Sequence, residues 1–208
     1  MTESSKLKLL LATNNRGKVE EYRSLLMDLP VRLVTPRELG IAVEVDESGS
    51  TYEENARLKA VTLAKASGVA ALADDSGLEV DFLHGEPGIR SSRYAGEGAT
   101  DAGRVKYLLD KLQGVPWNKR TARFRCVIAI AAPDGTTEFC TGTCEGIIAL
   151  APRGDLGFGY DPIFYFPELD RTMAELPMDI KNRVSHRGKA AAQVPEALGK
   201  LGYKITKQ

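Results

Sequence analysis

The 208-residue sequence has no excess of charge of either sign, because its 28 basic and 28 acidic residues cancel. Proteins that bind duplex nucleic acid usually carry a basic excess, so this balance argues against nucleic acid as a partner. It does not exclude a small anionic ligand, since a few local cations are enough to bind one. We therefore expect no nucleic-acid partner, and the charge balance is compatible with a small-molecule partner.

Cysteine is scarce, and its pattern excludes the common cysteine-based sites. Cys126, Cys140 and Cys144 are odd in number, form no CxxC pair, and lie in apolar or Thr-rich stretches with the pattern of strands. A zinc site would need closer clustering of ligands. These residues are typical of small buried side chains in a reducing compartment.

Long apolar runs are also missing. The run at residues 7–12 is interrupted by Lys8 and is far too short to span a bilayer. We therefore expect no membrane partner and a cytoplasmic location.

What is present is the composition of a globular protein, with 43% hydrophobic and 27% charged residues, and a length that suits a single domain over residues 1–208. Residues 8–12 have the pattern of a buried strand, and a polar loop follows at residues 13–18. The apolar residues between Val19 and Leu29 then recur at helical spacing, and Pro30 ends the pattern. The chain is thus predicted to open with a strand, a loop and a helix.

A long hairpin is predicted later in the chain. Alternate residues from Phe124 to Ile130 are apolar, Pro133 to Gly135 form a turn, and a second extended segment returns over residues 136–150. Together with the strand–helix units, this predicts an α/β fold with a long, twisted, mixed sheet and flanking helices. The hairpin, roughly residues 120–150, is expected to split off as a lobe, so that two lobes enclose a central cleft suited to a ligand.

The polar loop after the first strand is a candidate phosphate cradle. It consists of Thr13, Asn14, Asn15, Arg16, Gly17 and Lys18. A helix N-terminus offers backbone N–H groups and the positive end of the helix dipole, and Lys18 adds a full charge. The loop is not a Walker A motif, because Val19 follows the lysine. A helix cap with a solvated Lys18 is the alternative.

Two adjacent carboxylates, Asp74 and Asp75, follow the apolar strand at residues 69–73, and Ser76 and Gly77 continue this polar segment. Adjacent carboxylates repel each other unless a cation or hydrogen bonds compensate. Because neighbouring residues of an extended chain point opposite ways, one carboxylate is expected to face the cleft while the other braces the backbone. Oxygen ligands suit Mg²⁺. A surface turn is the alternative, against which the apolar strand argues.

An acidic segment at residues 44–54 offers further carboxylates. Thr51 and Glu54 have the spacing of a capping box at the start of a helix. Glu47 is a candidate second metal ligand, although the spacing does not select it from its acidic neighbours.

Aromatic and polar residues recur in the C-terminal third of the chain, at Phe158, Gly159, Tyr160, Asp161, Lys181, His186 and Arg187. Aromatic rings beside a glycine can stack on a flat base. Asp161 can accept hydrogen bonds from a base edge, and Lys181, His186 and Arg187 can donate to phosphate or to a keto oxygen. A histidine before a helix is by itself more often a cap or a surface residue, so both roles stay open for His186.

Together these segments resemble the inosine triphosphate pyrophosphatase family, and the bacterial dITP/XTP pyrophosphatases in particular. The resemblance runs from about residue 9 to residue 201. It rests on the passages ATNNRGK (residues 12–18), ENARLKA (54–60), ADDSGLEVD (73–81), FGYDPIF (158–164) and SHRGKA (185–190), with SSRYAGE (91–97) as a sixth. Asn14 stands where many bacterial relatives have glycine, which is a mild departure.

The resemblance implies a two-lobed α/β fold, a homodimer, and magnesium-dependent hydrolysis of non-canonical purine nucleoside triphosphates (ITP, dITP and XTP) to the monophosphate and pyrophosphate. It assigns the triphosphate to the loop from Thr13 to Lys18 and Mg²⁺ to Glu47 and Asp75. Asp75 would also be the general base, with Ser76 lining the site. The resemblance assigns binding of the base and its neighbouring groups to Phe158, Gly159, Tyr160, Asp161, Lys181, His186 and Arg187.

Two other functions remain open from the sequence. One is a pyrophosphatase for other modified nucleotides, which a substrate panel would distinguish. The other is a non-catalytic regulator that binds nucleotides, which would need neither Asp75 nor release of pyrophosphate.

Overall fold

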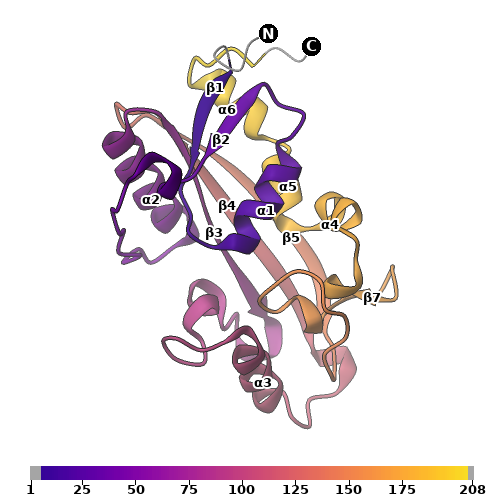
Figure 1. Cartoon of the computed structure of the whole chain (residues 1–208). Coiled ribbons are helices and arrows are strands. Elements are labelled where there is room, and N and C mark those ends of the chain that lie inside the picture. The colour runs from indigo at the N-terminus through magenta and orange to yellow at the C-terminus, as the bar shows by residue number, and fades with distance from the viewer. Residues whose placement is uncertain (1–5, 206–208) are drawn as a thin grey trace. The chain divides into compact units, whose positions relative to one another are not determined.

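The computed structural model describes residues 6–205 and contains a seven-stranded sheet with helices beside it (Figure 1). The strands are β1 (Leu7–Leu11), β2 (Val31–Val34), β3 (Ala70–Val80), β4 (Thr121–Ala131), β5 (Thr137–Ile148), β6 (Phe164–Phe166) and β7 (Arg171–Thr172). Their order is β2-β1-β3-β4-β5-β6-β7. β1 is parallel to β2 and β3, whereas β6 is antiparallel to β5 and β7. The predicted α/β class with a mixed sheet is therefore confirmed.

The α-helices are α1 (Arg16–Leu25), α2 (Tyr52–Ser67), α3 (Asp101–Lys111), α4 (Met178–Val184), α5 (His186–Ala191) and α6 (Val194–Lys200). The opening strand, loop and helix are present as predicted, with Asn15 as the N-cap of α1. Within residues 6–205, no helix is long and apolar enough to cross a membrane.

The chain divides into two compact units. The first comprises the described residues up to Asp75 together with residues 126–142 and 187–205. Leu9 and Leu11 of β1 pack in one core with Tyr22 of α1 and Leu198 of α6. Leu10 is also fully buried and points to the opposite face, because strand side chains alternate. Helix α2 lies against β1. The β2-β1-β3 part of this unit is thus parallel, and β1 is buried on both faces, which accounts for its continuous apolar sequence.

The second unit comprises residues 76–125 and 143–186. Its core brings Leu108 of α3 together with Leu78 of β3 and with Phe124 and Phe164, whose ring centroids are 4.6 Å apart. Gly146 is required by this packing, because a Cβ there would come within 2.7 Å of the Phe164 ring.

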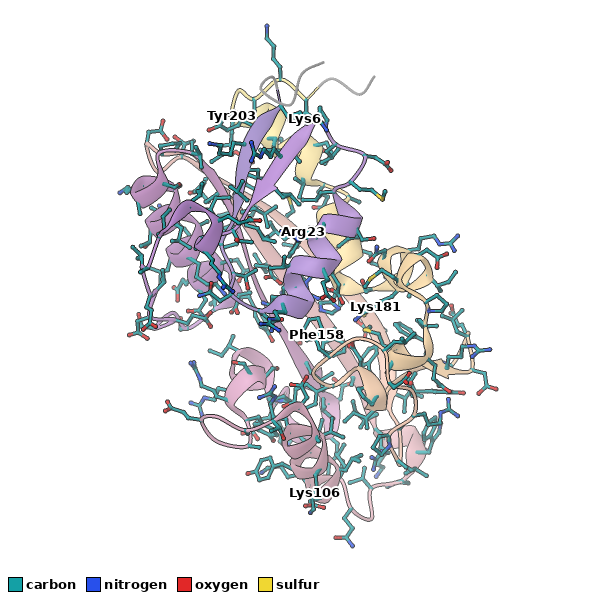
Figure 2. The ribbon with its side chains drawn as sticks, viewed as in Figure 1. Lys6, Arg23, Lys106, Phe158, Lys181 and Tyr203 are labelled. Atoms are coloured by element: carbon teal, nitrogen blue, oxygen red, sulfur yellow. The ribbon has the colours of Figure 1, made fainter. Side chains whose placement is uncertain are left out.

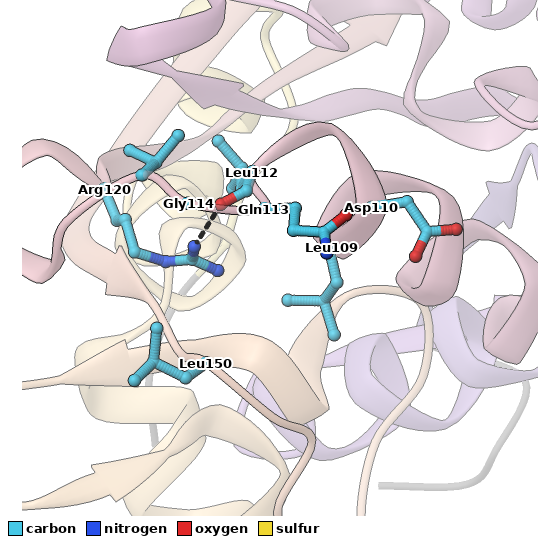
Figure 3. A pocket seen from close by; sticks show the side chains of 8 residues that line it. Leu109, Asp110, Leu112, Gln113, Gly114, Arg120 and Leu150 are labelled. Atoms are coloured by element: carbon cyan, nitrogen blue, oxygen red, sulfur yellow. Dashed lines mark hydrogen bonds between the residues drawn. The ribbon is translucent and has the colours of Figure 1, made fainter.

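A buried arginine ties helix α3 to strand β5 within the second unit. Arg120 is 3% exposed and donates to the carbonyl oxygens of Leu112, Ile148 and Ala149 at 2.7–2.9 Å. It lines a hollow of about 460 Å³ that also includes Leu109 and Leu150, and Figure 3 shows its bond to Leu112. Because three carbonyls share the guanidinium, we assign Arg120 a structural role at this hollow.

The predicted hairpin is formed by β4 and β5. Its turn is closed by hydrogen bonds between Ala132 and Thr136 and from Gly135 to Ala132, both 2.9 Å long. Residues 126–142 belong to the first unit, whereas residues 121–125 and 143–148 belong to the second. The hairpin therefore contributes to both units and does not form one by itself. The cleft expected between two lobes stays a prediction.

Two local predictions are corrected. The polar segment from Asp74 to Gly77 does not end the strand predicted at residues 69–73: β3 runs through it without a break to Val80. The capping box at α2 differs in its second half. The Thr51 hydroxyl accepts from the Glu54 N–H at 3.1 Å, whereas the Glu54 carboxylate accepts at 2.6 Å from the Ser50 N–H, one residue before the N-cap.

Candidate active site

The loop after β1 lies at the carboxyl end of a parallel strand pair, a common place for ligands in α/β sheets. Thr13 accepts from the Asn15 N–H and Asn15 accepts from the Lys18 N–H, each at 3.1 Å. The N–H groups of Arg16 and Gly17, in the first turn of α1, have no partner within the helix by position. Asn14, Asn15 and Arg16 are exposed. The loop is therefore both a capped helix start and a place where N–H groups face outward.

The Lys18 side chain is not simply solvated. It is 16% exposed, and its ammonium lies 2.9 Å from the Asp74 carboxylate. Asp74 is fully buried, which by itself raises its pKa, but Lys18 and Arg187 hold that pKa well below its ordinary value. Asp74 is thus permanently ionised near neutral pH and fixes the end of the Lys18 side chain.

Asp75 points the other way, as the alternation along β3 requires. Its carboxylate accepts from the Asn55 amide at 3.2 Å and lies 3.6 Å from the Lys59 ammonium, both on α2. Burial raises the pKa of Asp75 from its ordinary value, although Lys59 and Lys18 act against this shift. The two aspartates are 2% and 6% exposed, which excludes a surface turn. A buried carboxylate with a raised pKa is suited to accept a proton.

Lys59 joins two carboxylates and a backbone carbonyl oxygen. Its ammonium lies 2.8 Å from the Glu47 carboxylate, 2.8 Å from the Asp74 carbonyl oxygen and 3.6 Å from Asp75. Burial lowers the pKa of Lys59, but the carboxylates of Asp75, Asp74 and Glu47 more than offset this and raise it. Glu47, which sequence spacing could not select, is therefore the member of the acidic segment that shares a cation with Asp75.

The donor set fits a hard divalent cation. Glu47 and Asp75 are oxygen donors that both face one positive charge, and Glu47 is 34% exposed and open to water. No group of three or more His, Cys, Asp or Glu residues with metal-ligating geometry occurs among residues 6–205. Mg²⁺ commonly uses only one or two protein carboxylates and keeps waters or phosphate oxygens as its other ligands, so two are sufficient.

Arg187 is at the centre of a buried ionic cluster in the first unit. Its guanidinium donates to Asp74 at 3.1 and 3.2 Å and to Glu21 of α1 at 2.6 Å. All three side chains are at most 3% exposed. The two carboxylates raise the pKa of Arg187 despite its burial. Arg187 therefore links β3, α1 and α5.

The second unit brings the turn that contains the FGYD residues into contact with Lys181 of α4. The Asp161 carboxylate accepts from the Phe158 N–H at 2.9 Å and from the Lys181 ammonium at 2.5 Å. That ammonium also lies 5.2 Å from the centroid of the Phe158 ring (Figure 2). Gly157 must be glycine, since its φ is +76° and a Cβ would meet the Asp161 carboxylate. Asp161 thus braces the turn that presents an aromatic face beside a cation.

Three other predicted residues also belong to the second unit. Tyr160 is buried and donates from its hydroxyl to the Ser91 carbonyl oxygen at 3.0 Å. The His186 ring stacks on Phe124 with centroids 4.6 Å apart and interplanar angle 12°, so His186 is not a surface residue. Ser76 is half-buried on β3.

Comparison with known proteins identifies the family. The model of the Ham1 family matches residues 9–197. The chain belongs to the Ham1 family. It is 51% identical to a dITP/XTP pyrophosphatase of Desulforamulus reducens over 94% of this chain and 97% of the relative, and 47% identical to that of Geobacter sulfurreducens over 94% and 98%.

Solved Ham1 structures have the same fold. A HAM1 protein from Coxiella burnetii is 44% identical, with a TM-score of 0.83 over 93% of this chain and 99% of that one. A nucleoside-triphosphatase (dITP/XTP pyrophosphatase) from Mycobacterium abscessus is 40% identical, with a TM-score of 0.72 over 90% and 98%. The Ham1 match therefore includes both units and every candidate residue.

Sequence reasoning missed three residues that this Ham1 chain places in the site. Asn55 and Lys59 lie four residues apart on α2, the spacing that puts two side chains on one helix face. Glu21 follows Lys18 by three residues on α1, which is the same signal. The helical spacing of Asn55 and Lys59, and that of Lys18 and Glu21, can be seen in the sequence. The residues that they contact on β3 and α5 cannot.

Proposed function

We propose that the chain is a nucleoside triphosphate pyrophosphatase that hydrolyses ITP, dITP and XTP to the nucleoside monophosphate and pyrophosphate, and so removes non-canonical purines from the nucleotide pool. The observation that carries this proposal is Asp75, a buried carboxylate with a raised pKa, held by Asn55 and Lys59 in the middle of β3. The names of the Desulforamulus and Geobacter relatives support the same reaction.

The first unit would hold the triphosphate. The outward N–H groups at the start of α1 and the Lys18 ammonium would neutralise the phosphate oxygens and the charge that develops on the leaving pyrophosphate. Asp74 supports this role because it holds the Lys18 ammonium in place. Water would attack the α-phosphorus, the bond from that phosphorus to the bridging oxygen would break, and Asp75 would accept the proton of the attacking water.

Glu47 and Asp75 would hold Mg²⁺. The contact that both carboxylates make with Lys59 supports this assignment. When bound, the ion would neutralise and orient the phosphate oxygens for in-line displacement. Lys59 would keep the two carboxylates close to each other in the absence of the ion.

The turn in the second unit would hold the base. The half-buried Phe158 ring offers a stacking face, and Lys181 beside it offers donors to a keto oxygen. Adenine carries an amino group at position six, where hypoxanthine and xanthine carry oxygen. A buried donor left unpaired by that amino group costs about 1–3 kcal/mol, or roughly 5- to 150-fold per contact. His186 and Arg187 remain candidates for the same contact, although Arg187 is already engaged by two carboxylates.

We also propose that the protein is a homodimer in the cytoplasm. The buried reduced thiols of Cys126, Cys140 and Cys144 support a reducing compartment, and the family resemblance supports the dimer. Light scattering of the purified protein would give a mass of two chains, and a mass of one chain would contradict the dimer.

A substrate panel tests the proposed reaction. With Mg²⁺, the protein should release pyrophosphate from ITP, dITP and XTP faster than from ATP, and Asp75→Asn should lower the rate of this release by about 10²-fold or more. Release of orthophosphate, or faster turnover of modified pyrimidine nucleotides, would contradict the proposed reaction. Binding of ITP without turnover would instead indicate a regulator.

A further inference from the structure

The turn at residues 157–161 is held from outside by a second carboxylate, which belongs to helix α3. The Gly159 N–H donates to Asp101 at 2.7 Å, across 58 residues of sequence. Asp161 accepts from the Phe158 N–H within the turn, whereas Asp101 connects the turn to helix α3. Two consecutive N–H groups of the turn are thus bound by carboxylates from different segments.

Asp101 is itself held in place. Its other carboxylate oxygen pairs with Arg104, which also donates to the carbonyl oxygens of Ala99 and Ser92. Asp101 is the first residue of α3, and Thr100 is the N-cap. The capping function is therefore already filled by Thr100, and the Asp101 carboxylate is directed to Gly159 and Arg104.

The SSRYAGE passage, which has no other role in the site, supplies a second tie to the same turn. The Ser91 carbonyl oxygen accepts from the Tyr160 hydroxyl at 3.0 Å. The Ser91 hydroxyl accepts from the Leu78 N–H at 2.9 Å and donates to the Gly88 carbonyl oxygen at 2.6 Å. The passage thus connects β3 and the turn, and Asp101 completes the connection from the start of α3.

We infer that Asp101 is a positioning residue, which holds the turn so that the Phe158 ring and the Lys181 ammonium present a fixed surface to a purine base. This inference rests on the base-binding role proposed for that turn. Asp101 acts through the Gly159 backbone and does not itself contact the base. Its loss should therefore weaken binding of nucleotides through their bases and leave binding of a polyphosphate without a base unchanged.

The test compares Asp101→Ala with Asp110→Ala, which removes an exposed carboxylate from the same helix and breaks only its ion pair with Lys106. Asp101→Ala should raise KM for ITP by about 2- to 12-fold, the range for loss of one typical intramolecular hydrogen bond. The inhibition constant of inorganic tripolyphosphate and kcat should stay close to those of Asp110→Ala. Asp101→Asn, which keeps an acceptor for Gly159, should restore most of the ITP binding.

A double-mutant cycle with Phe158→Ala separates this inference from the proposed base-binding role. If Asp101 acts through the turn, its effect on KM for ITP should be much smaller once Phe158 is absent. Full additivity, an unchanged KM in Asp101→Ala, or an equal loss of tripolyphosphate binding would overturn the inference. If Phe158→Ala itself leaves KM unchanged, the base-binding role of the turn is wrong, and the inference about Asp101 fails with it.

Discussion

The Arg187 guanidinium donates through Nε and Nη2 to one carboxylate oxygen of Asp74, at 3.2 and 3.1 Å, although the two residues are 113 positions apart. Both side chains are at most 3% exposed. The pair is continued by Glu21, which accepts from Nη1 at 2.6 Å. A buried ion pair of this kind is weak evidence for net stability, but removal of one member leaves uncompensated charge in the interior.

Arg187→Ala should therefore lower the free energy of unfolding by about 3–5 kcal/mol, because Asp74 and Glu21 would both lose a buried partner. Urea denaturation measures this change. Arg183→Ala is the matched control, since Arg183 forms only an exposed i,i+4 pair with Asp179 and should change stability by less than about 1 kcal/mol. If the two variants were equally stable, the buried cluster would not have the energetic role assigned to it.

The features that the sequence predicted are those set by local pattern. The strand, loop and helix at the start of the chain follow from apolar spacing, and the opposite directions of Asp74 and Asp75 follow from alternation along a strand. The same polar residues also suggested a break in the strand. β3 nevertheless continues through them, because Lys18 and Arg187 compensate the Asp74 charge and Lys59 and Asn55 engage Asp75.

What could not be predicted depends on contacts between distant segments. Nothing near Arg187 in the sequence indicates that its partners are Asp74 and Glu21. Glu47 could not be distinguished from its acidic neighbours, because the distinguishing contact is with Lys59 on a helix that begins five residues later. Asp101 gave no signal at all, since an acidic residue in the first turn of a helix is common and its bond to Gly159 spans 58 residues.

Asp75→Asn should separate function from stability. Loss of a general base should lower kcat by about 10²- to 10⁴-fold in an assay of pyrophosphate release. The pKa of Asp75 is raised in the folded state, so its contribution to stability is present below the unfolded pKa and is lost as pH rises through the folded pKa. At neutral pH the ionised carboxylate therefore opposes folding, and the neutral amide should leave the free energy of unfolding unchanged or higher.

Two results for Asp75→Asn would contradict these expectations. Turnover close to that of the unmodified protein would remove Asp75 as the base. A loss of stability at neutral pH would mean that the contacts with Lys59 and Asn55 outweigh the effect of burial on the carboxylate.

Asp74→Asn should have the opposite effect on stability. Because Lys18 and Arg187 depress the pKa of Asp74, its contribution is present above the unfolded pKa and is lost as pH falls through the lower, folded value. The free energy of unfolding of the unmodified protein should fall between about pH 5 and pH 2, whereas that of Asp74→Asn should be lower at neutral pH and change less over this interval. Urea titrations at several pH values measure both slopes, and parallel slopes would contradict the assigned ion pairs.

Lys59→Met tests whether Lys59 tunes the base. The Lys59 charge lowers the pKa of Asp75 and so acts against the effect of burial. Its removal should raise that pKa further, and a general base works only when it is deprotonated. The acid limb of the profile of kcat/KM against pH should therefore move to higher pH. Lys65→Met, at an exposed position of the same helix, should leave the limb in place. A limb that stays in place in Lys59→Met, or moves to lower pH, would show that the titrating group is not an Asp75 carboxylate facing this ammonium.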